Sequence, residues 1–162
     1  MNPPDIPARA AELGKALQAR GARVATAESC TGGLVAGAIT AIAGSSAWFE
    51  RGFVTYSNEA KIEMLGVAAG TLAAHGAVSE ATAAEMASGA LARSRADVTV
   101  AVTGIAGPDG GTPGKPVGTV CFGWARRGGA VATATRHFPG DRAAVRAATV
   151  EVALQGILDR LN

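Results

Sequence analysis

The first third of the chain carries apolar residues at spacings that predict a helix, a strand and a second helix. Apolar positions recur at helical spacing over residues 5–20, and Gly21 stands where such a helix would end. The run "RVATAE" (23–28) predicts a short strand, and the glycine pair at 32–33 predicts a turn. The run "LVAGAITAIAG" (34–44) then predicts a helix whose larger apolar residues share one face.

The middle of the chain continues this alternation of strands and helices. The run "RGFVTYS" (51–57) predicts a strand, and "SNEAKIEMLG" predicts a short helix that begins after Ser57 and ends at Gly66. A further helical region begins near Thr71, and Ser79 is expected to cap the long alanine-rich stretch that follows. Such alternation is typical of α/β proteins.

The last third predicts a strand, a loop, a hairpin and a final helix. The alternating run "DVTVAVTG" (97–104) predicts the strand, and the glycine- and proline-rich segment 104–116 predicts the loop. Two strand-like runs separated by "RRGG" predict an antiparallel hairpin, and Asp141 is expected to cap the C-terminal helix. Together these elements predict one α/β domain over residues 1–162, layered α/β/α, with a mixed sheet that includes the hairpin.

Composition and charge narrow the class of protein. The 162 residues are 48% hydrophobic, which fits a domain with a single core. Only 4% are aromatic and the formal net charge is +2, so the chain lacks the basic and aromatic surface typical of a nucleic-acid-binding protein. The N-terminus does not follow the pattern of a signal peptide, and the longest apolar stretch is too short to span a bilayer. We therefore expect a soluble, cytoplasmic protein with neither nucleic acid nor membrane as a partner.

Cysteine and histidine residues are too few and too scattered to indicate a disulfide framework or a zinc site. Cys30 and Cys121 lie far apart without a CxxC spacing. The two histidines, His75 and His137, are expected at the surface or in loops. We predict no metal and no cofactor.

The stretch "AESCTGG" (27–33) is the first place where chemistry could occur. Ser29 follows a predicted strand and precedes a predicted helix, which is where an open α/β sheet forms its binding crevice and where free N–H groups can hold an anion or an oxyanion. The two glycines allow close approach of the backbone. The structural alternative is that Ser29 or Thr31 only caps the following helix.

The stretch "TYSNEAK" supplies a second candidate. Tyr56 ends a predicted strand, and Lys61 lies about one turn into the next helix. A cation in the first turn opposes the helix dipole, which disfavours the ammonium form and lowers the lysine pKa toward that of a usable base. The alternative is a solvated surface lysine.

The loop 104–116 and the segment "PGDRAAVR" are the remaining candidates. The loop matches neither the Walker pattern nor GxGxxG, but a glycine-dense loop after a buried strand can line an anion site with its N–H groups. Arg142 begins the last helix, at the end that the dipole makes unfavourable for a cation, and a shared phosphate or carboxylate would explain it. The alternatives are a plain flexible connection and an ordinary exposed arginine.

Four motifs taken together resemble a known family. The stretches "ESCTGG", "YSNEAK", "TGIAGPDGGTPGKPVGTV" and "GDR..VR", in this order and with these separations, are similar to the C-terminal domain of the competence/damage-inducible protein family. The resemblance covers about residues 8–160. It implies the hydrolysis of nicotinamide mononucleotide to nicotinic acid mononucleotide and ammonia, in the recycling of pyridine nucleotides.

The resemblance also implies roles for individual residues. It makes Ser29 the nucleophile, Lys61 its base and Tyr56 an assisting or orienting group, with N–H groups near the glycine pair holding the oxyanion. Glu28 is expected to bind the ribose or the amide, or to orient Lys61, whereas Cys30 is expected to point away from the pocket. The substrate-binding residues expected in total are Glu28, Thr31, Gly32, Gly33, Thr103, Gly104, Ala106, Gly107 and Arg142.

Other functions stay open at this point. The chain could be a nucleotide-binding module without turnover, an interaction protein of the competence and damage response, or an amidohydrolase for a different small amide. The alanine-rich helices lead us to expect a homo-oligomer, a dimer or higher.

Overall fold

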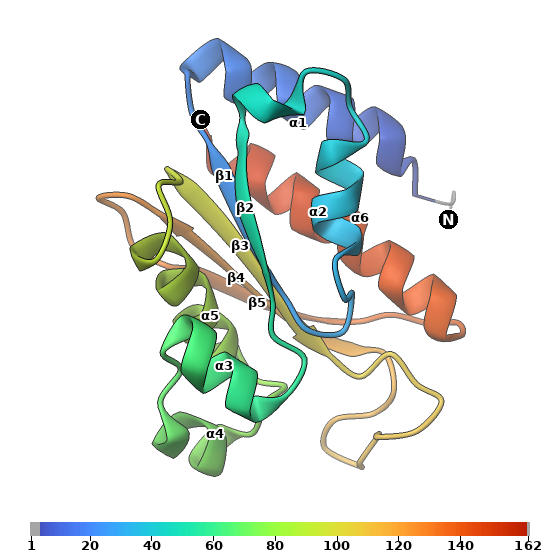
Figure 1. The fold of residues 1–162 in the computed structure, drawn as a ribbon. Helices are drawn as coiled ribbons and strands as arrows, with labels where there is room; N and C mark the ends of the chain where they lie inside the picture. Colours follow the sequence, from blue (N-terminus) through green and yellow to red (C-terminus); the bar gives the residue numbers. More distant parts are fainter. Residues whose placement is uncertain (1–3, 162) are drawn as a thin grey trace.

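The computed structural model describes residues 4–161 and contains one β-sheet between two layers of helices (Figure 1). The elements in chain order are α1 (Ile6–Arg20), β1 (Val24–Glu28), α2 (Leu34–Thr40), the 3₁₀ turn η1 (Ser45–Ala47), β2 (Phe49–Val54), α3 (Asn58–Leu65), α4 (Ala69–His75), α5 (Glu80–Ala92), β3 (Val98–Gly104), β4 (Thr119–Arg126), β5 (Ala132–His137) and α6 (Arg142–Asp159). This agrees with the expected alternation of strands and helices.

The sheet has the strand order β2–β1–β3–β4–β5. β1 pairs in parallel with both β2 and β3, whereas β3–β4 and β4–β5 pair antiparallel. All five residues of β1 are buried, as expected for a central strand covered on both faces. The predicted mixed sheet with an antiparallel hairpin is therefore confirmed.

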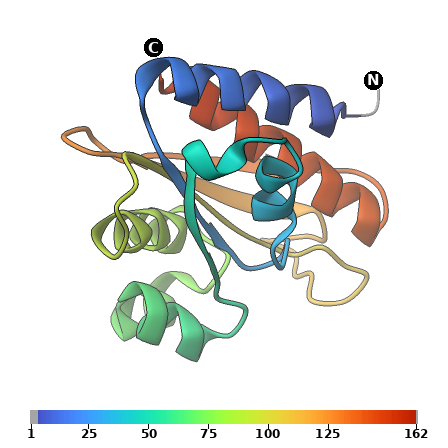
Figure 2. The ribbon, with the colours of Figure 1, turned by 45° about the horizontal axis from the view of Figure 1, so that its top comes forward.

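Helices cover both faces of the sheet. α1, α2 and α6 contact one another on one face, and α3 and α4 contact α5, which packs on the other face (Figures 1 and 2). Two apolar cores result, one that includes Leu13, Phe122 and Leu154 and one that includes Leu65 and Met86. The predicted α/β/α layering is confirmed.

The predicted helix starts are confirmed by side-chain caps. Asp5, Ser57, Ser79 and Asp141 each accept a hydrogen bond from the backbone N–H three residues later, at 2.9–3.1 Å. Gly66 ends α3 with φ 70°, a left-handed conformation that glycine adopts without strain. The Ser57 cap fixes the start of α3, the helix that carries Lys61.

Some element boundaries differ from the sequence prediction. The helix expected over 34–44 ends at Thr40, and Gly44 then adopts φ 88° ahead of η1. The strand expected over 51–57 runs from Phe49 to Val54, because its register with β1 begins at Phe49. The helical region expected to begin near Thr71 begins at Ala69 and ends at His75, ahead of Gly76 with φ 79°, and the helix capped by Ser79 follows as a separate element. Local propensity did not indicate where tertiary pairing ends an element.

The connections of β1 and β2 leave the sheet on opposite faces. The chain passes from β1 through α2 on one face, and from β2 through α3, α4 and α5 on the other. In open α/β sheets, ligands bind outside the carboxyl ends of strands where the connections diverge in this way. The topology therefore places a binding crevice beside Ser29, which directly follows β1.

The two histidines lie at the surface, as the sequence analysis expected. His75 and His137 are exposed, and Cys30 and Cys121 are buried free thiols. Across residues 4–161, no cluster of three or more His, Cys, Asp or Glu side chains could hold a metal ion. None of the helices in this range is both long and apolar enough to cross a membrane.

The glycine at position 89 allows α5 to approach the C-terminal end of α3. A Cβ atom built on Gly89 would lie 1.9 Å from the carbonyl oxygen of Leu65, which is backbone and cannot rotate away. We expect Gly89→Ala to lower the free energy of unfolding by about 2 kcal/mol through overpacking. Urea denaturation followed by circular dichroism measures this change.

Gly37 offers a matched control because it is also helical but has no atom within 4 Å of a built Cβ. Gly37→Ala should leave stability unchanged or raise it by about 0.5–1 kcal/mol through helix propensity. Equal stabilities of Gly89→Ala and the wild type would contradict the close approach of α5 and α3.

Candidate active site

A pocket of about 210 Å³ lies outside the carboxyl ends of the parallel strands. Ser29 reaches it from the turn after β1, Tyr56 from the segment after β2, and Arg142 from the start of α6. Its full lining is Ser29, Cys30, Tyr56, Gly104, Ile105, Ala106, Gly107, Asp109, Gly110 and Arg142. Of the twelve residues that the sequence analysis expected at the site, six line this pocket.

Lys61 lies directly beside Ser29. Its Nζ is 3.1 Å from Ser29 Oγ, 2.9 Å from the carbonyl oxygen of Thr55 and 3.1 Å from that of Tyr56. Only 1% of Lys61 is exposed, and it has no salt-bridge partner within residues 4–161. The solvated surface lysine that the sequence left open is therefore wrong.

Burial lowers the pKa of Lys61 from its ordinary value. The sequence analysis expected the same direction from the helix dipole, but the larger cause in the folded protein is desolvation. In the neutral amine, two N–H groups can donate to the carbonyls of Thr55 and Tyr56, and the nitrogen lone pair then remains for the hydroxyl of Ser29. The geometry thus suits proton transfer from Ser29 Oγ to Lys61 Nζ.

Tyr56 contacts the site through its backbone and its side chain in different ways. Its carbonyl oxygen accepts from Lys61 and lies 3.4 Å from Ser29 Oγ. Its side chain is largely exposed, and its hydroxyl accepts from Nη2 of Arg142 at 3.2 Å. The backbone therefore positions Lys61, and the phenol forms part of the pocket wall.

Glu28 has contacts that differ from the roles expected from the sequence. Its buried carboxylate accepts from the Thr31 hydroxyl at 2.6 Å and from the N–H groups of Gly33, Val35 and Ala36 at 2.8–3.2 Å. It has no contact with Lys61 and does not line the pocket. Glu28 thus holds the start of α2, where a negative charge is favourable, and shapes the turn that carries Ser29.

The N–H groups of the glycine pair after Ser29 already have hydrogen-bond acceptors. The N–H of Gly32 donates to the carbonyl of Ser29 at 3.0 Å, and the N–H of Gly33 donates to Glu28. Gly32 and Gly33 have φ of 56° and 112°, which requires glycine at both positions. Within residues 4–161, the N–H of Cys30 has no oxygen acceptor, so it is better placed than the glycine N–H groups to meet an oxyanion.

Of the remaining expected substrate-binding residues, some line the pocket and Thr103 lies outside it. Thr103 is buried, and its hydroxyl donates to the carbonyl of Ala77 at 2.9 Å, outside the pocket. Arg142 donates from Nη1 to the carbonyl of Gly107 at 2.9 Å. The N–H groups of Ala106 and Gly107 have no acceptor in the described part of the chain. Arg142 and these N–H groups together can receive an anion.

Two charged residues at the site were not singled out from the sequence. Asp109 lines the pocket from the loop after β3. Arg146, on α6, donates to the carbonyl oxygens of Cys30 and Thr31. Arg146 is the second arginine of the motif "GDR..VR", one helical turn after Arg142, and this spacing on one helix face could have indicated it.

The thiol of Cys30 is adjacent to Ser29 but is a poor nucleophile. Burial raises its pKa to about 11. At pH 7 only roughly one thiol in ten thousand is then ionised. We expect iodoacetamide to label Cys30 far more slowly than glutathione in the same solution, with a rate that rises as pH approaches 11. Peptide mass spectrometry measures this rate, and complete labelling within minutes at pH 7 would contradict the assignment.

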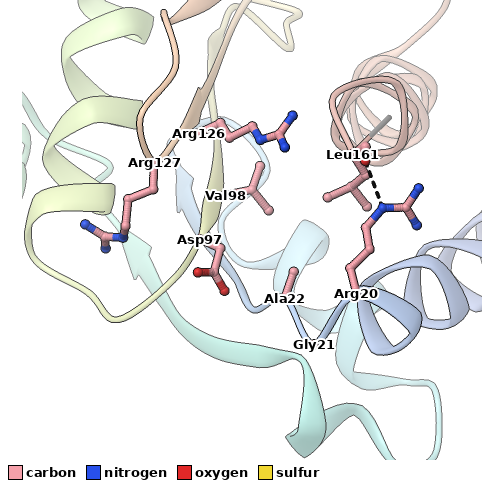
Figure 3. A pocket seen from close by; sticks show the side chains of 8 residues that line it. All are labelled: Arg20, Gly21, Ala22, Asp97, Val98, Arg126, Arg127 and Leu161. Carbon is pink, nitrogen blue, oxygen red and sulfur yellow. Dashed lines mark hydrogen bonds between the residues drawn. The ribbon is translucent and has the colours of Figure 1, made fainter.

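A larger cavity of about 430 Å³ lies at the amino ends of β1 and β3, away from Ser29 (Figure 3). Its arginines donate to backbone carbonyls, with Leu161 as the acceptor of Arg20, Arg160 as that of Arg126 and Ala96 as that of Arg127. Guanidinium groups at the C-terminal ends of helices stabilise the exposed carbonyls and the helix dipole. These contacts explain the charges of this cavity without a ligand.

Comparisons with known proteins identify relatives of this chain over most of its length. The family model described as CinA C-terminal domain matches residues 7–161. The nicotinamide-nucleotide amidohydrolase PncC of Escherichia coli (strain K12) is 62% identical over 144 residues, which cover 89% of this chain and 87% of that protein. A CinA-like protein of Chloroherpeton thalassium is 53% identical over 153 residues, which cover 93% of this chain but 36% of that longer protein.

A solved structure shares both the fold and much of the sequence. The competence/damage inducible protein CihA from Agrobacterium tumefaciens superposes with a TM-score of 0.94 at 52% identity, covering 100% of this chain and 98% of that one. The family match, the sequence identities and the shared fold extend over nearly the whole chain. The chain therefore belongs to the CinA C-terminal domain family.

Proposed function

We propose that this protein is a nicotinamide-nucleotide amidohydrolase, which converts nicotinamide mononucleotide to nicotinic acid mononucleotide and ammonia by a serine mechanism. The observation that carries the proposal is the contact of 3.1 Å between the buried Lys61 Nζ and Ser29 Oγ at the pocket. Relatives named for this activity that are 60–62% identical over most of their length support the choice of substrate.

The first step forms an acyl-enzyme. Lys61 Nζ takes the hydroxyl proton of Ser29, and Ser29 Oγ attacks the carboxamide carbon while the carbonyl electrons move to oxygen. Contacts to the carbonyls of Thr55 and Tyr56 hold the amine in place for this transfer. The ammonium of Lys61 then protonates the leaving nitrogen, the C–N bond breaks, and ammonia departs.

The second step restores the enzyme. A water molecule gives a proton to the neutral Lys61 and attacks the acyl carbon, and the resulting tetrahedral intermediate expels Ser29 Oγ. Lys61 returns the proton to Ser29, and the product is released as the carboxylic acid, which loses its proton to water and becomes a carboxylate. In both steps the N–H of Cys30 is the donor that we assign to the oxyanion, and one such donor is worth about 3 kcal/mol of barrier.

The anionic part of the substrate fits the side of the pocket that Arg142 forms. A phosphate there can accept from the guanidinium and from the free N–H groups of Ala106 and Gly107. Arg142 would exchange its contacts with the Tyr56 hydroxyl and the Gly107 carbonyl for this charged partner. We therefore assign Gly104, Ala106, Gly107 and Arg142 to substrate binding.

The test is ammonia release from nicotinamide mononucleotide by the purified protein in the presence of a chelator, with product identity checked by chromatography. We expect stoichiometric ammonia and nicotinic acid mononucleotide. Free nicotinamide and glutamine serve as control amides, since neither carries a ribose phosphate. Calorimetric binding of the nucleotide without turnover would instead favour a binding module, and turnover of a control amide alone would favour another small amide.

The biological setting is part of the same proposal. Deamidation of this nucleotide belongs to the recycling of pyridine nucleotides, a process of the cytoplasm, and calls for no metal or organic cofactor. A homo-oligomer, a dimer or higher, stays a prediction that light scattering of the purified protein can test. Leu34 and Val54, both exposed apolar residues beside the site, are candidates for its interface.

A further inference from the structure

Arg146 binds the turn that carries the nucleophile. From the second turn of α6, its Nε donates to the carbonyl of Cys30 at 3.1 Å and its Nη2 donates to that of Thr31 at 3.2 Å. The guanidinium also packs over the turn, since a Cβ built on Gly32 would lie 3.7 Å from Nη2. Hydrogen bonds from a charged donor are stronger than neutral ones, and the two bonds here come from one planar group.

The turn is held from two sides. Glu28 binds the Thr31 hydroxyl and the Gly33 N–H, and Arg146 binds two successive carbonyl oxygens. Because a trans peptide is planar with opposed C=O and N–H groups, fixing these two carbonyls fixes the N–H directions of Thr31 and Gly32. The Gly32 N–H donates to the carbonyl of Ser29, which shares its peptide plane with the Cys30 N–H, so the restraint extends to that N–H. Ser29 and Cys30, at the start of this turn, both line the pocket.

The contacts of Arg146 separate it from the substrate-binding arginine. Arg142 lines the pocket, whereas Arg146 does not. Arg146 forms no salt bridge with the carboxylates of residues 4–161, and both of its hydrogen bonds are to the turn at residues 29–33 that carries Ser29. This partly buried guanidinium binds two carbonyls of the turn and does not line the pocket. We therefore expect its loss to change the geometry of the turn and not the binding of the ligand.

We propose that Arg146 is a positioning residue, which holds the Cys30 and Thr31 carbonyls so that Ser29 Oγ and the Cys30 N–H face the reacting carbonyl of the substrate. This inference rests on the proposed acylation of Ser29. Misplacement of a reacting group by about 1 Å costs roughly 10²-fold in rate. Loss of Arg146 therefore lowers turnover while substrate affinity is retained.

The kinetic test compares Arg146→Ala and Arg146→Lys with the wild type on nicotinamide mononucleotide and on its nucleoside, which lacks the phosphate. For Arg146→Ala we expect kcat to fall about 10²-fold on both substrates with little change in KM. Arg142→Ala should instead raise KM for the nucleotide alone. Arg136→Ala is the matched control, because Arg136 is exposed and donates only to the carbonyl of Thr135.

Two further measurements separate positioning from a general loss of structure. Arg146→Lys keeps one cationic donor and should retain an intermediate kcat. Its thermal midpoint is recorded to check that the fold is intact. Added guanidinium ion should restore part of the kcat of Arg146→Ala and should not change that of Arg136→Ala. A selective rise in KM for the nucleotide, or kcat within twofold of the wild type in Arg146→Ala, would overturn the proposal.

Labelling by an alkyl fluorophosphonate tests the same inference without the proposed substrate. Ser29 Oγ forms a bond to phosphorus, the P–F bond breaks, fluoride leaves, and the serine proton passes to Lys61. We expect Arg146→Ala to slow this reaction by about the same factor as kcat. Labelling of the wild type without turnover of the nucleotide would reject the substrate and keep the inference, whereas equal labelling of wild type and variant would reject the inference.

Discussion

Ser29→Ala is expected to lower ammonia release from nicotinamide mononucleotide by about 10⁴-fold or more while leaving nucleotide binding nearly unchanged. The variant removes the only hydroxyl that lies within hydrogen-bond distance of Lys61 Nζ in residues 4–161. The pocket loses one oxygen atom and keeps Arg142 and the loop N–H groups. Steady-state ammonia release together with calorimetric titration of the nucleotide measures both quantities.

Ser46→Ala is the matched control for this experiment, because Ser46 is exposed and lies in η1, away from the pocket. It should turn over the nucleotide at the wild-type rate. Full turnover by Ser29→Ala would show that the nucleophile is another group. Loss of both turnover and binding would point to a role of Ser29 in holding the turn.

Lys61→Met is expected to lower kcat by about 10³-fold, because among residues 4–161 only the Lys61 side chain offers Ser29 Oγ a base at hydrogen-bond distance. Lys61→Arg should be equally inactive, since a guanidinium keeps the positive charge but does not release a proton in this pH range. In the wild type, kcat/KM should rise with pH along a limb whose midpoint lies below the usual lysine value, because burial lowers the pKa of Lys61. The pH–rate profile measures this midpoint.

The same lowered pKa links Lys61 to stability. Between the folded pKa and the unfolded value of about 10.4, the unfolded chain binds more protons than the folded one. The free energy of unfolding of the wild type relative to Lys61→Met should therefore rise with pH through this window and be lowest below it. Denaturation of both proteins at several pH values measures the difference.

Lys15→Met is the matched control, since Lys15 is exposed on α1. It should change neither the pH–rate profile nor the pH dependence of stability. A wild-type profile without an ascending limb below the usual lysine pKa would contradict the role of Lys61 as the base. A pH-independent stability difference between the wild type and Lys61→Met would contradict the burial of an ionisable amine.

The sequence by itself determined most of the fold and supplied the candidates for the reacting groups. Side-chain caps at Asp5, Ser57, Ser79 and Asp141 are local signals, because each cap bonds an N–H only three residues away. The four motifs also identified Ser29 and Lys61 as candidates through residue type and spacing. These features depend on short-range contacts, which a sequence pattern contains.

Only the tertiary structure decided how these groups act. The pKa of Lys61 depends on its burial beside Ser29, which lies 32 residues earlier in the chain and is brought near by the pairing of β1 with β2. Glu28, beside Ser29 in the sequence, was expected to bind the substrate or to orient Lys61. In the structure its carboxylate instead accepts hydrogen bonds from N–H groups at the start of α2. Arg146 reaches the nucleophile turn from 115 residues later in the sequence. Such contacts arise from packing of distant elements, and the local pattern of residues does not encode their geometry.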